Sequence, residues 1–475
     1  MITTVIFDMD GVIVDTQSAL DIHEFCFLKK LTAGKWSIDN QHSVRGRSLI
    51  DVYYMLKIKF NFNTPLEIYL QEYDKVLKNI YTVMAEPLPG SIETIRNLAF
   101  KKYILALASS SSHKLISIIM KRFNLTDYFR VIVSADDVKG KSKPEPDIFL
   151  LTAKKLSVKP SECVVIEDSE NGIKAAKRAG MFCIGYKDSS HSQKLNLADK
   201  VITSFENEDT FSLISRIEKS GYLVEKVKKA HNRYYFATSE YVNKSDYYSD
   251  FLMDVLMRLF DKKKPISILE IGTGRGYLSI ILTKTFSNII KAVAVDRNAH
   301  AIQLAQMNVA LNDLNDRVEI RKGNMYNIIR SDEHFDFIFG ALPQMPVTKK
   351  DLFNIQNTSI AKYHLNTSAG GFDGLYFVRK LVERAPSHLE KDGLLAHVQA
   401  EFSHPDRTAS YMREAGLTVM GAKKRRKLLS ETTLTQILKL HIEKQGFSFH
   451  KDIQGLEYFH LVVVIGKNNY VNRRI

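Results

Sequence analysis

Short apolar runs alternate with amphipathic stretches along most of the chain. In the first half, the runs "YILALAS", "VIVSA", "CVVIED" and "CIGYK" are separated by helical patterns such as "NGIKAAKRAG". Runs of this length that alternate with helices predict a parallel sheet joined by crossover helices. Two strand–turn–helix starts, "TTVIFDMDGVIVDT" and "ISILEIGTGRGYLSIIL", each open such a series. The pattern therefore predicts an α/β protein with two Rossmann-like domains.

The two series also predict the domain boundaries. A chain of 475 residues is too long for one ordinary hydrophobic core. Residues 1–210 and residues 222–475 are expected to form the two domains, with the junction between them. A helical pattern at about residues 17–82, which contains "SALDIHEFCFLKKL" and "LEIYLQEYDKVLKNIYTVM", interrupts the first series. We expect it to form a helical insertion, or cap, on the first sheet.

The composition indicates the class of protein and the compartment in which it is expected. Hydrophobic residues make up 45% and charged residues 25% of the chain, which is typical of a globular protein. No apolar run reaches the length needed to span a bilayer, and "MITTVIFDMDG" lacks the basic start and apolar run of a signal peptide. The three scattered cysteines form neither a disulfide framework nor a metal-ligand pair. A cytoplasmic protein without a membrane partner is expected.

The formal net charge of +14 would permit attraction to nucleic acid or to acidic metabolites. The basic residues are scattered along helical segments rather than gathered into one arm. The densest cluster, "KKRRK" at Lys423–Lys427, follows the strand-like run "GLTVMGA" and is interpreted as a solvated strand end or loop. No nucleic-acid-binding motif accompanies it. We therefore expect small-molecule substrates and no nucleic-acid partner.

Two carboxylates follow the first strand directly. In "DMDGVIVDT", Asp8 and Asp10 are two residues apart at the end of an apolar run. Such a pair can share Mg²⁺ while one carboxylate attacks phosphorus and the other transfers a proton. The spacing alone is weak evidence, because many Asp-x-Asp pairs are structural.

Later strands supply further polar groups in a matching order. Ser109 ends the strand in "LALASSSS", and Lys143 lies in "KGKSKPEPDIF". Glu167 and Asp168 end the strand in "VVIEDSENG". Open α/β sheets bind ligands at the carboxyl ends of their strands, where these groups are expected to meet.

Together these motifs resemble the haloacid dehalogenase superfamily, in the branch of β-phosphoglucomutase-like and phosphoglycolate-phosphatase-like enzymes, over about the first 205 residues. The resemblance implies that Asp8 is a nucleophile that forms an aspartyl-phosphate and that Asp10 is the general acid and base. It implies that Ser109 and Lys143 hold the phosphoryl group. The implied Mg²⁺ ligands are Asp8, Asp10 and Asp168, assisted by Glu167. The helical insertion would be the cap that selects the substrate.

The cap departs from the mutase pattern. The segment "SVRGRSLIDV" offers Arg45 and Arg47 as substrate contacts, but Leu49 stands where the mutase has an arginine. His23 is out of step with the mutase's cap histidine and is interpreted as an ordinary residue of the cap helix. A mutase must hold a sugar phosphate in two orientations, so these departures favour a phosphatase.

The second series opens on a glycine-rich loop. In "ILEIGTGRG", Glu270 ends a strand and is followed by Gly272, Gly274 and Gly276. The spacing is G-x-G-x-G, which differs from the G-x-G-x-x-G of dinucleotide-binding enzymes. Glycines allow the backbone to approach a ligand closely. The next strand, "KAVAVD", ends in Asp296, which is placed to accept hydrogen bonds from ribose hydroxyls.

This series resembles a class I methyltransferase that uses S-adenosylmethionine, from about Leu223 to the C-terminus, with "GLTVMGAKKRR" and "FHLVVVIGKN" as a closing pair of strands. The resemblance implies a seven-stranded sheet. Within the class, "GGFDGLYFVRKL" resembles a segment of the HemK-like protein-glutamine methyltransferases. The residues that would contact the cofactor by this resemblance are Glu270, Gly272, Gly274, Asp296 and, in place of the usual acid, Asn324.

The turn after "FDFIFG" departs from that family. HemK-like enzymes carry Asn-Pro-Pro-Tyr at this turn, and the asparagine accepts a hydrogen bond from the target amide. Here the four positions are Ala341, Leu342, Pro343 and Gln344. Alanine has no side-chain acceptor, so methylation of an amide nitrogen loses its main support. Plant methionine S-methyltransferases resemble the stretch through an Ile-Pro-Gln turn, which leaves amine, thioether, ring nitrogen and hydroxyl acceptors open.

An aromatic segment precedes the second series. "HNRYYFATSEYVNKSDYY" contains Tyr235, Tyr241 and Tyr247, which are candidates for lining an acceptor pocket. Such a segment also suits a half-buried helix.

Three functions follow from these motifs. The first is a bifunctional enzyme, in which a Mg²⁺-dependent phosphatase is fused to a methyltransferase that acts on a small molecule through N, S or O. The second is a methyltransferase that modifies a protein side chain. The third is a domain that binds S-adenosylmethionine and regulates a phosphatase or phosphomutase.

Overall fold

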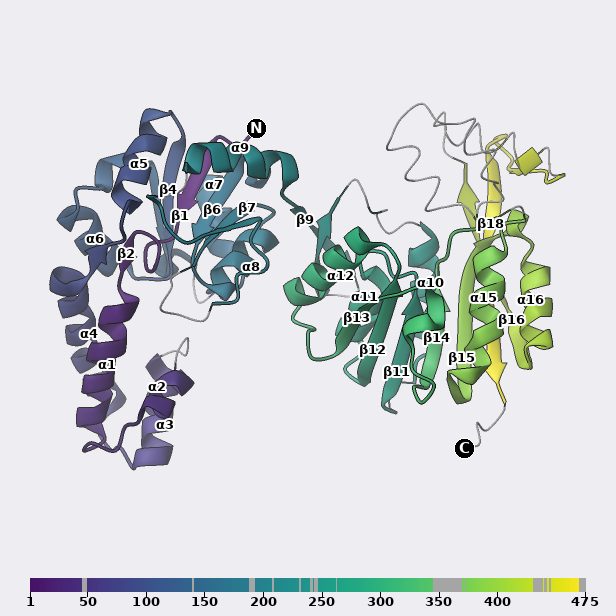
Figure 1. Cartoon of the computed structure of the whole chain (residues 1–475), viewed down its shortest axis with the longest axis horizontal. Helices are drawn as coiled ribbons and strands as arrows, with labels where there is room; N and C mark the ends of the chain where they lie inside the picture. Colours follow the sequence, from purple (N-terminus) through teal and green to yellow (C-terminus); the bar gives the residue numbers. More distant parts are fainter. Residues whose placement is uncertain are drawn as a thin grey trace. The chain divides into compact units, whose positions relative to one another are not determined.

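The chain forms two compact units, Met1–Val224 and Glu225–Ile475 (Figure 1). The computed structural model describes residues 1–44, 49–138, 141–187, 193–206, 209–229, 232–239, 242, 247–261, 263–344, 370–371, 373–429, 439, 442–443 and 446–469. Arg45, Arg47 and Tyr241 lie outside the described residues. None of the described helices is long and apolar enough to cross a membrane.

The first unit is built on a six-stranded parallel sheet, as the alternation of apolar runs and helices predicts. The strand order is β5-β4-β1-β6-β7-β8, and every neighbouring pair is parallel. The strands are β1 (Thr4–Phe7), β4 (Ile104–Ser109), β5 (Val131–Ser134), β6 (Cys163–Glu167), β7 (Phe182–Tyr186) and β8 (Lys200–Ile202). Strands β1 and β6 are completely buried, which explains their continuous apolar runs.

Helices cover both faces of this sheet. The helices are α5 (Ser91–Phe100), α6 (His113–Arg122), α7 (Asp147–Leu156), α8 (Glu170–Arg178) and α9 (Thr210–Ser220). Apolar side chains of α5, α6 and α9 share one core with alternate residues of β1, β4 and β6. Helices α7 and α8 contact one another and cover β4–β7 from the other side. Helix α9 therefore belongs to the core of the first unit.

A helical cap fills the predicted insertion. It contains α1 (Gln17–Leu31), α2 (Ile38–Val44), α3 (Leu49–Phe60), α4 (Leu66–Asn79) and the π-helical turn η1 (Ile80–Met84). A short antiparallel ribbon of β2 (Val14–Asp15) and β3 (Glu86–Pro87) joins it to the sheet. The cap has its own small core, which includes Leu28, Trp36, Leu56, Tyr69 and Tyr73.

The second unit is built on an eight-stranded sheet, in which a series of seven strands, the number expected, is extended by one short strand. The order is β13-β12-β11-β14-β15-β18-β16, with the short β17 paired to β18. These strands are β11 (Ile266–Ile271), β12 (Ile289–Asp296), β13 (Val318–Lys322), β14 (Phe335–Gly340), β15 (Leu389–Ala400), β16 (Leu417–Leu428), β17 (His450–Lys451) and β18 (Glu457–Asn468). Strands β11–β15 are parallel, and β18 runs antiparallel to β15 and β16. The prediction of a closing strand pair is confirmed.

Two helical layers enclose this sheet. Helices α10 (Tyr247–Leu259), α11 (Tyr277–Thr285) and α12 (Ala299–Leu311) pack on one face. Helices α15 (Tyr376–Arg384) and α16 (Pro405–Glu414) pack on the other. A separate two-stranded ribbon, β9 (Leu223–Lys229) with β10 (Asn232–Thr238), precedes α10. The side chains of Asn308 on α12 and of Asn312 at its C-cap hydrogen-bond to the backbone of β10.

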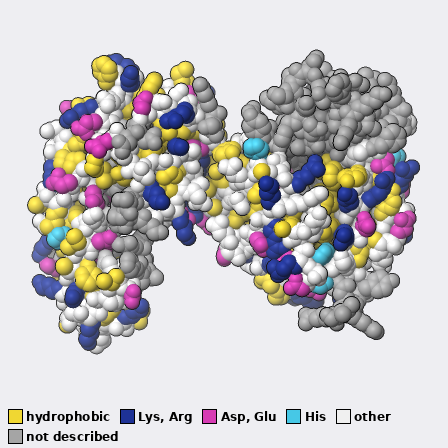
Figure 2. All heavy atoms as spheres, viewed as in Figure 1, with side chains coloured by type: hydrophobic (Ala, Val, Ile, Leu, Met, Phe, Trp, Pro, Cys, Tyr) yellow, Lys and Arg dark blue, Asp and Glu magenta, His cyan; other side chains and the backbone are white. Residues whose placement is uncertain are grey.

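The basic cluster Lys423–Lys427 lies within β16, an edge strand of the second sheet. Arg425 pairs with Asp254 at 2.7 Å, and Arg426 pairs with Asp452. Charged side chains on an edge strand discourage pairing with other chains. On the face in Figure 2, Lys and Arg side chains are interspersed with Asp and Glu rather than gathered into one patch.

A buried ion pair fastens the end of the first unit. The ammonium group of Lys177 on α8 is fully buried and donates to both carboxylate oxygens of Asp199, at 2.9 and 2.7 Å. It also donates to the carbonyl oxygen of Tyr222. Asp199 accepts the backbone N–H groups of Cys183 and Tyr222, at 2.7 and 2.9 Å. This network joins α8, the start of β7 and the segment after α9.

We predict that Lys177→Met destabilises the first unit by about 3–5 kcal/mol, because it leaves the Asp199 charge buried and unpaired. Denaturant unfolding followed by circular dichroism measures the loss. Lys75→Met is the control, since Lys75 pairs with Glu72 at the surface, with 72% of its side chain exposed, and surface pairs contribute little. Equal stability of Lys177→Met and the wild type would contradict the prediction.

Candidate active sites

The carboxyl ends of β1 and β6 bring three predicted residues of the first unit together. Asp8 directly follows β1, and its backbone N–H donates to the carbonyl of Ile166 on β6 at 3.0 Å. The ammonium group of Lys143 donates to Asp8 Oδ1 at 2.6 Å and to Glu167 Oε1 at 2.7 Å. The exposed fractions of the three side chains are 8% for Asp8, 7% for Lys143 and 1% for Glu167. Lys143 therefore bridges two buried carboxylates.

The charges at this edge are strongly coupled. Burial raises the pKa of Asp8 to about 7, although the nearby Lys143 opposes the shift. Burial, together with the charges of Glu167 and Asp8, raises the pKa of Asp168 to about 9. Burial alone would lower the pKa of Lys143, but Asp8 and Glu167 raise it above its ordinary value. The site holds more negative than positive charge.

Asp10 lies in a different environment, because its carboxylate is surrounded by hydroxyl groups. Its Oδ1 accepts hydrogen bonds from Thr16 at 2.9 Å and from Tyr81 at 2.6 Å. Its Oδ2 accepts from Ser111 at 2.8 Å and from Ser109 at 3.3 Å. Burial and the Asp10 charge raise the pKa of Tyr81, which stays protonated and donates. Asp10 is thus aimed by residues from the cap and from the end of β4.

Two glycines make room for the acidic groups. A Cβ on Gly11 would lie 2.3 Å from Oδ2 of Asp168, so Asp168 packs directly on the turn that carries Asp8 and Asp10. A Cβ on Gly172 would lie 1.6 Å from Oε1 of Glu167. Carboxylate oxygens are the ligands that Mg²⁺ prefers, and a divalent cation would offset the excess negative charge. The residues present therefore fit Mg²⁺.

The structure brings several of the predicted residues together and adds others that the sequence did not indicate. Asp8, Lys143 and Glu167 are in contact, and Asp168 lies beside the same turn. The closer serine partner of Asp10 is Ser111 rather than Ser109. The repeated serines of "LALASSSS" are the sequence feature that could have indicated Ser111. Thr16 and Tyr81 were not identified, since nothing in a single sequence shows that the last turn of the cap reaches Asp10.

Of the cap residues, His23 lies half-buried on α1, and Leu49 begins α3.

In the second unit, the glycine loop turns sharply after β11. Gly272, Gly274 and Gly276 all have positive φ angles, of 77°, 56° and 82°. The N–H groups of Gly272 and Thr273 both donate to the carbonyl of Val295 on β12, at 2.8 and 3.0 Å. A Cβ on Gly274 would meet no atom within 4 Å. The loop is a fixed turn whose backbone is open at Gly274, where a ligand could approach it closely.

Glu270 braces this loop from inside the protein. It is 3% exposed, and its Oε2 accepts hydrogen bonds from the Thr273 hydroxyl at 2.8 Å and from the Ser279 N–H and hydroxyl at 3.0 and 2.5 Å. Burial raises its pKa to about 7, although these hydrogen bonds oppose the shift. The carboxylate thus ties the end of β11 to the loop and to the start of α11.

Asp296 stands at the end of β12, next to the loop. Its Oδ2 accepts the N–H of Gly274 at 2.9 Å, and its Oδ1 accepts the N–H of Asn298 at 2.9 Å. Carboxylate oxygens keep further lone pairs for ligand hydroxyls. Asn324 is exposed just beyond β13. The open glycine backbone, Asp296 and Asn324 fit a nucleoside-containing ligand such as S-adenosylmethionine.

The proline-containing turn lies against this loop. A Cβ on Gly272 would lie 2.7 Å from the Leu342 side chain, and a Cβ on Gly340 would lie 2.6 Å from the carbonyl oxygen of Ile271. The ends of β11 and β14 therefore touch, and the turn starting at Ala341 is adjacent to the glycine loop. Ala341 itself is partly buried against the core under α10 and α11.

The side-chain amide and the backbone carbonyl of Gln344 are both hydrogen-bonded within the protein. Its Nε2 donates to the carbonyl of Val398 at 3.0 Å, and its Oε1 accepts the N–H of Ala400 at 2.6 Å. Its own carbonyl accepts the hydroxyl of Ser403 at 3.0 Å. A Cβ on Gly374 would lie 2.4 Å from that carbonyl oxygen. The Gln344 amide thus fastens the turn to the end of β15.

His397 fixes the strand that leads into the turn. It is completely buried on β15, and its Nδ1 is 2.8 Å from the carbonyl oxygen of Gly340. A carbonyl can only accept, so Nδ1 carries the proton. Nε2 is buried and has no hydrogen-bond partner among the described residues. Burial lowers the pKa of His397 to about 4, so the ring is neutral near pH 7.

The two described tyrosines of the aromatic segment lie on different elements. Tyr235 is buried on β10, where its backbone is held by Asn312. Tyr247 begins α10, is 41% exposed and donates to the carbonyl of Arg426 at 3.1 Å.

Comparison with known proteins gives one family for each unit. Residues 5–186 match the family model described as haloacid dehalogenase-like hydrolase. Residues 242–357 match the model described as methyltransferase small domain. The first match contains Asp8, Lys143 and Glu167, and the second contains the glycine loop and the proline-containing turn.

Individual relatives agree with the first match. The protein YhcW of Bacillus subtilis (strain 168) is 35% identical over 195 residues, which cover 39% of this chain and 83% of the relative. The phosphorylated carbohydrates phosphatase of Thermotoga maritima is 31% identical over 177 residues, or 37% of this chain and 81% of the relative. A solved structure of β-phosphoglucomutase from Clostridium difficile is similar with 25% identity and a TM-score of 0.38, covering 46% of this chain and 99% of that one.

We predict that His397 makes the stability of the second unit depend on pH. The unfolded histidine has a pKa of about 6.5, so the unfolded state takes up the proton before the folded state does. Stability is therefore complete above about pH 6.5 and falls by up to about 3 kcal/mol as the pH approaches 4. The difference in unfolding free energy between the wild type and His397→Gln, measured across this range, should shrink on acidification.

Other groups titrate in the same range, so the exposed His300 serves as a control. The His300→Gln variant should follow the wild type at every pH. A wild-type advantage over His397→Gln that stays constant with pH would show that His397 is protonated as easily in the folded protein as in the unfolded one.

Proposed function

Because the chain belongs to the haloacid dehalogenase-like hydrolases through residues 5–186 and carries a methyltransferase small domain at residues 242–357, we propose that it catalyses two reactions on small molecules. The first unit removes a phosphoryl group, with Mg²⁺ and an aspartyl-phosphate. The second unit transfers a methyl group from S-adenosylmethionine. The observation that carries the first proposal is the buried bridge of Lys143 between Asp8 and Glu167.

In the proposed hydrolysis, a carboxylate oxygen of Asp8 attacks phosphorus while the bond to the leaving oxygen breaks. Asp10 gives that oxygen its proton and then takes a proton from water. The water oxygen attacks the same phosphorus, the Asp8–phosphorus bond breaks and phosphate leaves. Mg²⁺, when bound beside Asp8 and Asp168, supplies positive charge that offsets the repulsion between nucleophile and phosphoryl group.

Lys143 and the hydroxyls have binding roles in this scheme. Lys143 already holds Asp8 at 2.6 Å, and its third N–H makes only a long contact of 3.4 Å with the carbonyl oxygen of Ala108, so it can turn to a phosphoryl oxygen. Ser109 and Ser111 present hydroxyls at the end of β4, next to Asp10. The substrate class is a small phosphorylated metabolite. Phosphorylated carbohydrates are the first class to test, since one relative carries that name.

The contact of Leu342 with Gly272 carries the proposal for methyl transfer. It sets the turn that would receive the acceptor beside the loop that would hold the donor. S-adenosylmethionine, when bound, supplies a methyl group on a positively charged sulfur. The glycine backbone and Asp296 would hold its nucleoside part, with Glu270 keeping the loop in shape from beneath.

The acceptor is proposed to be a small molecule other than an amide. Ala341 offers no side-chain acceptor for an N–H group, and the Gln344 amide is occupied by Val398 and Ala400. An acceptor atom with its own lone pair, such as thioether sulfur, amine nitrogen or hydroxyl oxygen, does not need those contacts. This reasoning disfavours a glutamine side chain as the substrate.

We predict that Asp8→Asn abolishes phosphate release and leaves methyl transfer intact. The amide oxygen is a much weaker nucleophile than a carboxylate, so the rate should fall at least about a thousandfold. Phosphate release from a panel of sugar phosphates, with and without Mg²⁺, measures the effect. Asp15→Asn is the control, because Asp15 lies outside the Lys143 cluster and caps the start of α1. Hydrolysis retained by Asp8→Asn would remove Asp8 as the nucleophile.

For the second unit, the protein is incubated with S-adenosylmethionine labelled in its methyl group and with fractions of a cell extract. We predict labelled small molecules, and at least about a tenfold loss of label in Asp296→Ala, because the ribose loses its acceptor. The control is Asp332→Ala, since Asp332 is exposed and pairs with Arg330 at the surface. Label found only in protein would favour protein modification, and binding without any label transfer would favour a regulatory domain.

A further inference from the structure

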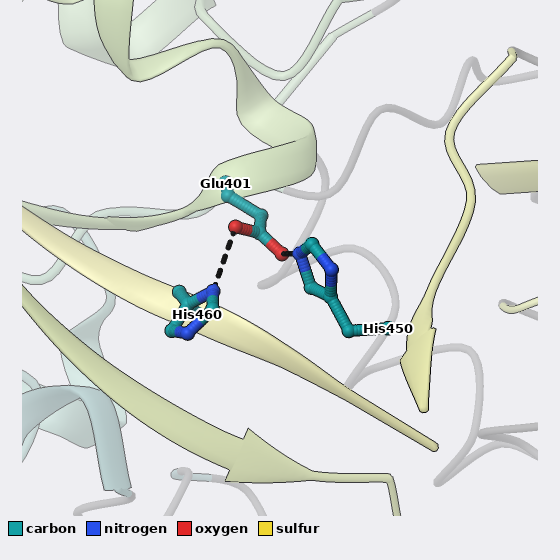
Figure 3. A group of neighbouring side chains, drawn as sticks. All are labelled: Glu401, His450 and His460. Carbon is teal, nitrogen blue, oxygen red and sulfur yellow. Dashed lines mark hydrogen bonds and ion pairs between the residues drawn. The ribbon is translucent and has the colours of Figure 1, made fainter. Parts of the chain in front are cut away.

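Two histidines and a glutamate meet just beyond the end of β15. Glu401 begins the 3₁₀ turn η7 (Glu401–Ser403) that follows β15, and His450 and His460 come from β17 and β18. His450 Nε2 lies 2.7 Å from Glu401 Oε1, and His460 Nδ1 lies 3.0 Å from Glu401 Oε2. Figure 3 shows the carboxylate between the two rings, with one oxygen directed at each.

We propose that Glu401, His450 and His460 bind a divalent transition-metal ion of the Zn²⁺ type. One ligand atom from each residue can be chosen so that all three lie within 4.8 Å of one another. Two ligands of a common zinc ion lie about 3–4 Å apart, since each bond is about 2.0–2.2 Å long. Small side-chain rotations therefore suffice to close the three atoms around one ion.

The contact between Glu401 and His450 is not an ordinary hydrogen bond. Glu401 Oε1 is buried and accepts no hydrogen bond of good geometry from the part of the chain that the structure describes, although Nε2 of His450 is 2.7 Å away. The nitrogen and the oxygen are close without being aligned as donor and acceptor. Ligands of a shared ion are arranged in this way, because their lone pairs point at the ion and not at each other.

The rings are positioned by the hairpin that carries them. His450 pairs with Tyr458 across the ladder, and Tyr458 and His460 are two residues apart on β18, so all three rings share a face. The His450 ring stacks on Tyr458 with 5.2 Å between centroids, and it lies 5.1 Å from the His460 ring. Asp452 closes the turn by accepting the N–H groups of Gln454 and Leu456, at 2.9 and 2.8 Å.

Charge and access both suit a cation. As metal ligands, two imidazoles and one carboxylate would offer a net charge of −1 to the ion, and Arg426 over the Tyr458 ring is paired with Asp452. The exposed fractions are 44% for His450 and 30% for His460, against 17% for Glu401. An ion could enter from solvent and keep an open coordination position, as zinc does when it binds substrate or water.

The site is joined to the proline-containing turn of the same unit. Ala400, which precedes Glu401, donates its N–H to Oε1 of Gln344, and Ser403 in the same η7 turn donates to the Gln344 carbonyl. A metal ion on Glu401 would therefore stiffen the segment that holds this turn. The proposal does not depend on either proposed activity.

The test measures metal binding by the full-length protein, stripped with a chelator and then kept in excess Mg²⁺ to saturate the carboxylates of the first unit. Titration calorimetry and elemental analysis should show one bound Zn²⁺ per chain, with a micromolar or lower dissociation constant. Each of His450→Ala, His460→Ala and Glu401→Gln should weaken binding at least about tenfold, because one of three ligands is lost. Co²⁺ should give a visible absorption band that the double histidine variant lacks.

His300→Ala is the matched control, since His300 is an exposed histidine of the same unit, and it should bind Zn²⁺ like the wild type. Circular dichroism of each variant shows whether it is folded, and His450→Ala, at the most exposed ligand, tests the site even if His460→Ala unfolds. Failure of the wild type to bind Zn²⁺, or equal binding by the double histidine variant, would overturn the proposal and leave the cluster as a pair of histidine–carboxylate contacts.

Discussion

The ammonium group of Lys143 lies between the carboxylates of Asp8 and Glu167, where water is largely excluded. A buried carboxylate is costly unless an opposite charge compensates it. Here one cation serves two carboxylates that leave neighbouring strands, β1 and β6, at the same edge. The parallel sheet brings the acidic side chains together, and Lys143 makes their proximity tolerable. Gly11, in the turn after β1, and Gly172, on α8, suit this arrangement, because neither position has space for a side chain.

The second unit meets a similar constraint in another way. Glu270 is as deeply buried as Glu167, but hydroxyl and N–H donors from Thr273 and Ser279 satisfy it in place of a cation. Burial raises the pKa of Glu270, and these hydrogen bonds oppose the shift. Both units thus use a buried glutamate to brace the segment that follows a central strand. In the first unit this glutamate belongs to a charged site. In the second unit it lies beneath the loop, and backbone groups and Asp296 form the surface of the loop.

Sequence alone predicted the parts of the fold that local patterns encode. Apolar runs gave the strands, and motifs at strand ends gave Asp8, Lys143 and the glycine loop, because a parallel sheet places all its carboxyl ends on one edge. Contacts between segments that are far apart in the sequence could not be predicted. Tyr81 reaches Asp10 across 71 positions, and Gln344 meets Ala400 across 56. Neither pairing follows from periodicity or composition, since each depends on how a loop crosses the sheet.

The same limit explains the histidine cluster. Glu401 and His460 are separated by 59 positions, and the spacing of the three residues matches no short metal-binding pattern. Only the antiparallel return of β18 beside β15 brings them together. The burial of the Gln344 amide against backbone groups cannot be read from residue order either. Physical context, rather than residue type, decided its role.

The four hydroxyls around Asp10 have a consequence for binding. A serine or tyrosine hydroxyl can donate one hydrogen bond, and the hydroxyls of Ser111 and Tyr81 both donate to Asp10. An anion that accepts a hydrogen bond from the Ser111 hydroxyl must therefore replace Asp10 as its acceptor. Binding of an anion at the end of β4 thus exchanges one hydrogen-bond partner of Ser111 for another. Binding of an anion and loss of the Ser111 hydrogen bond to Asp10 are then one linked equilibrium. Because Tyr81 also donates to Asp10, it extends this linkage to the last turn of the cap.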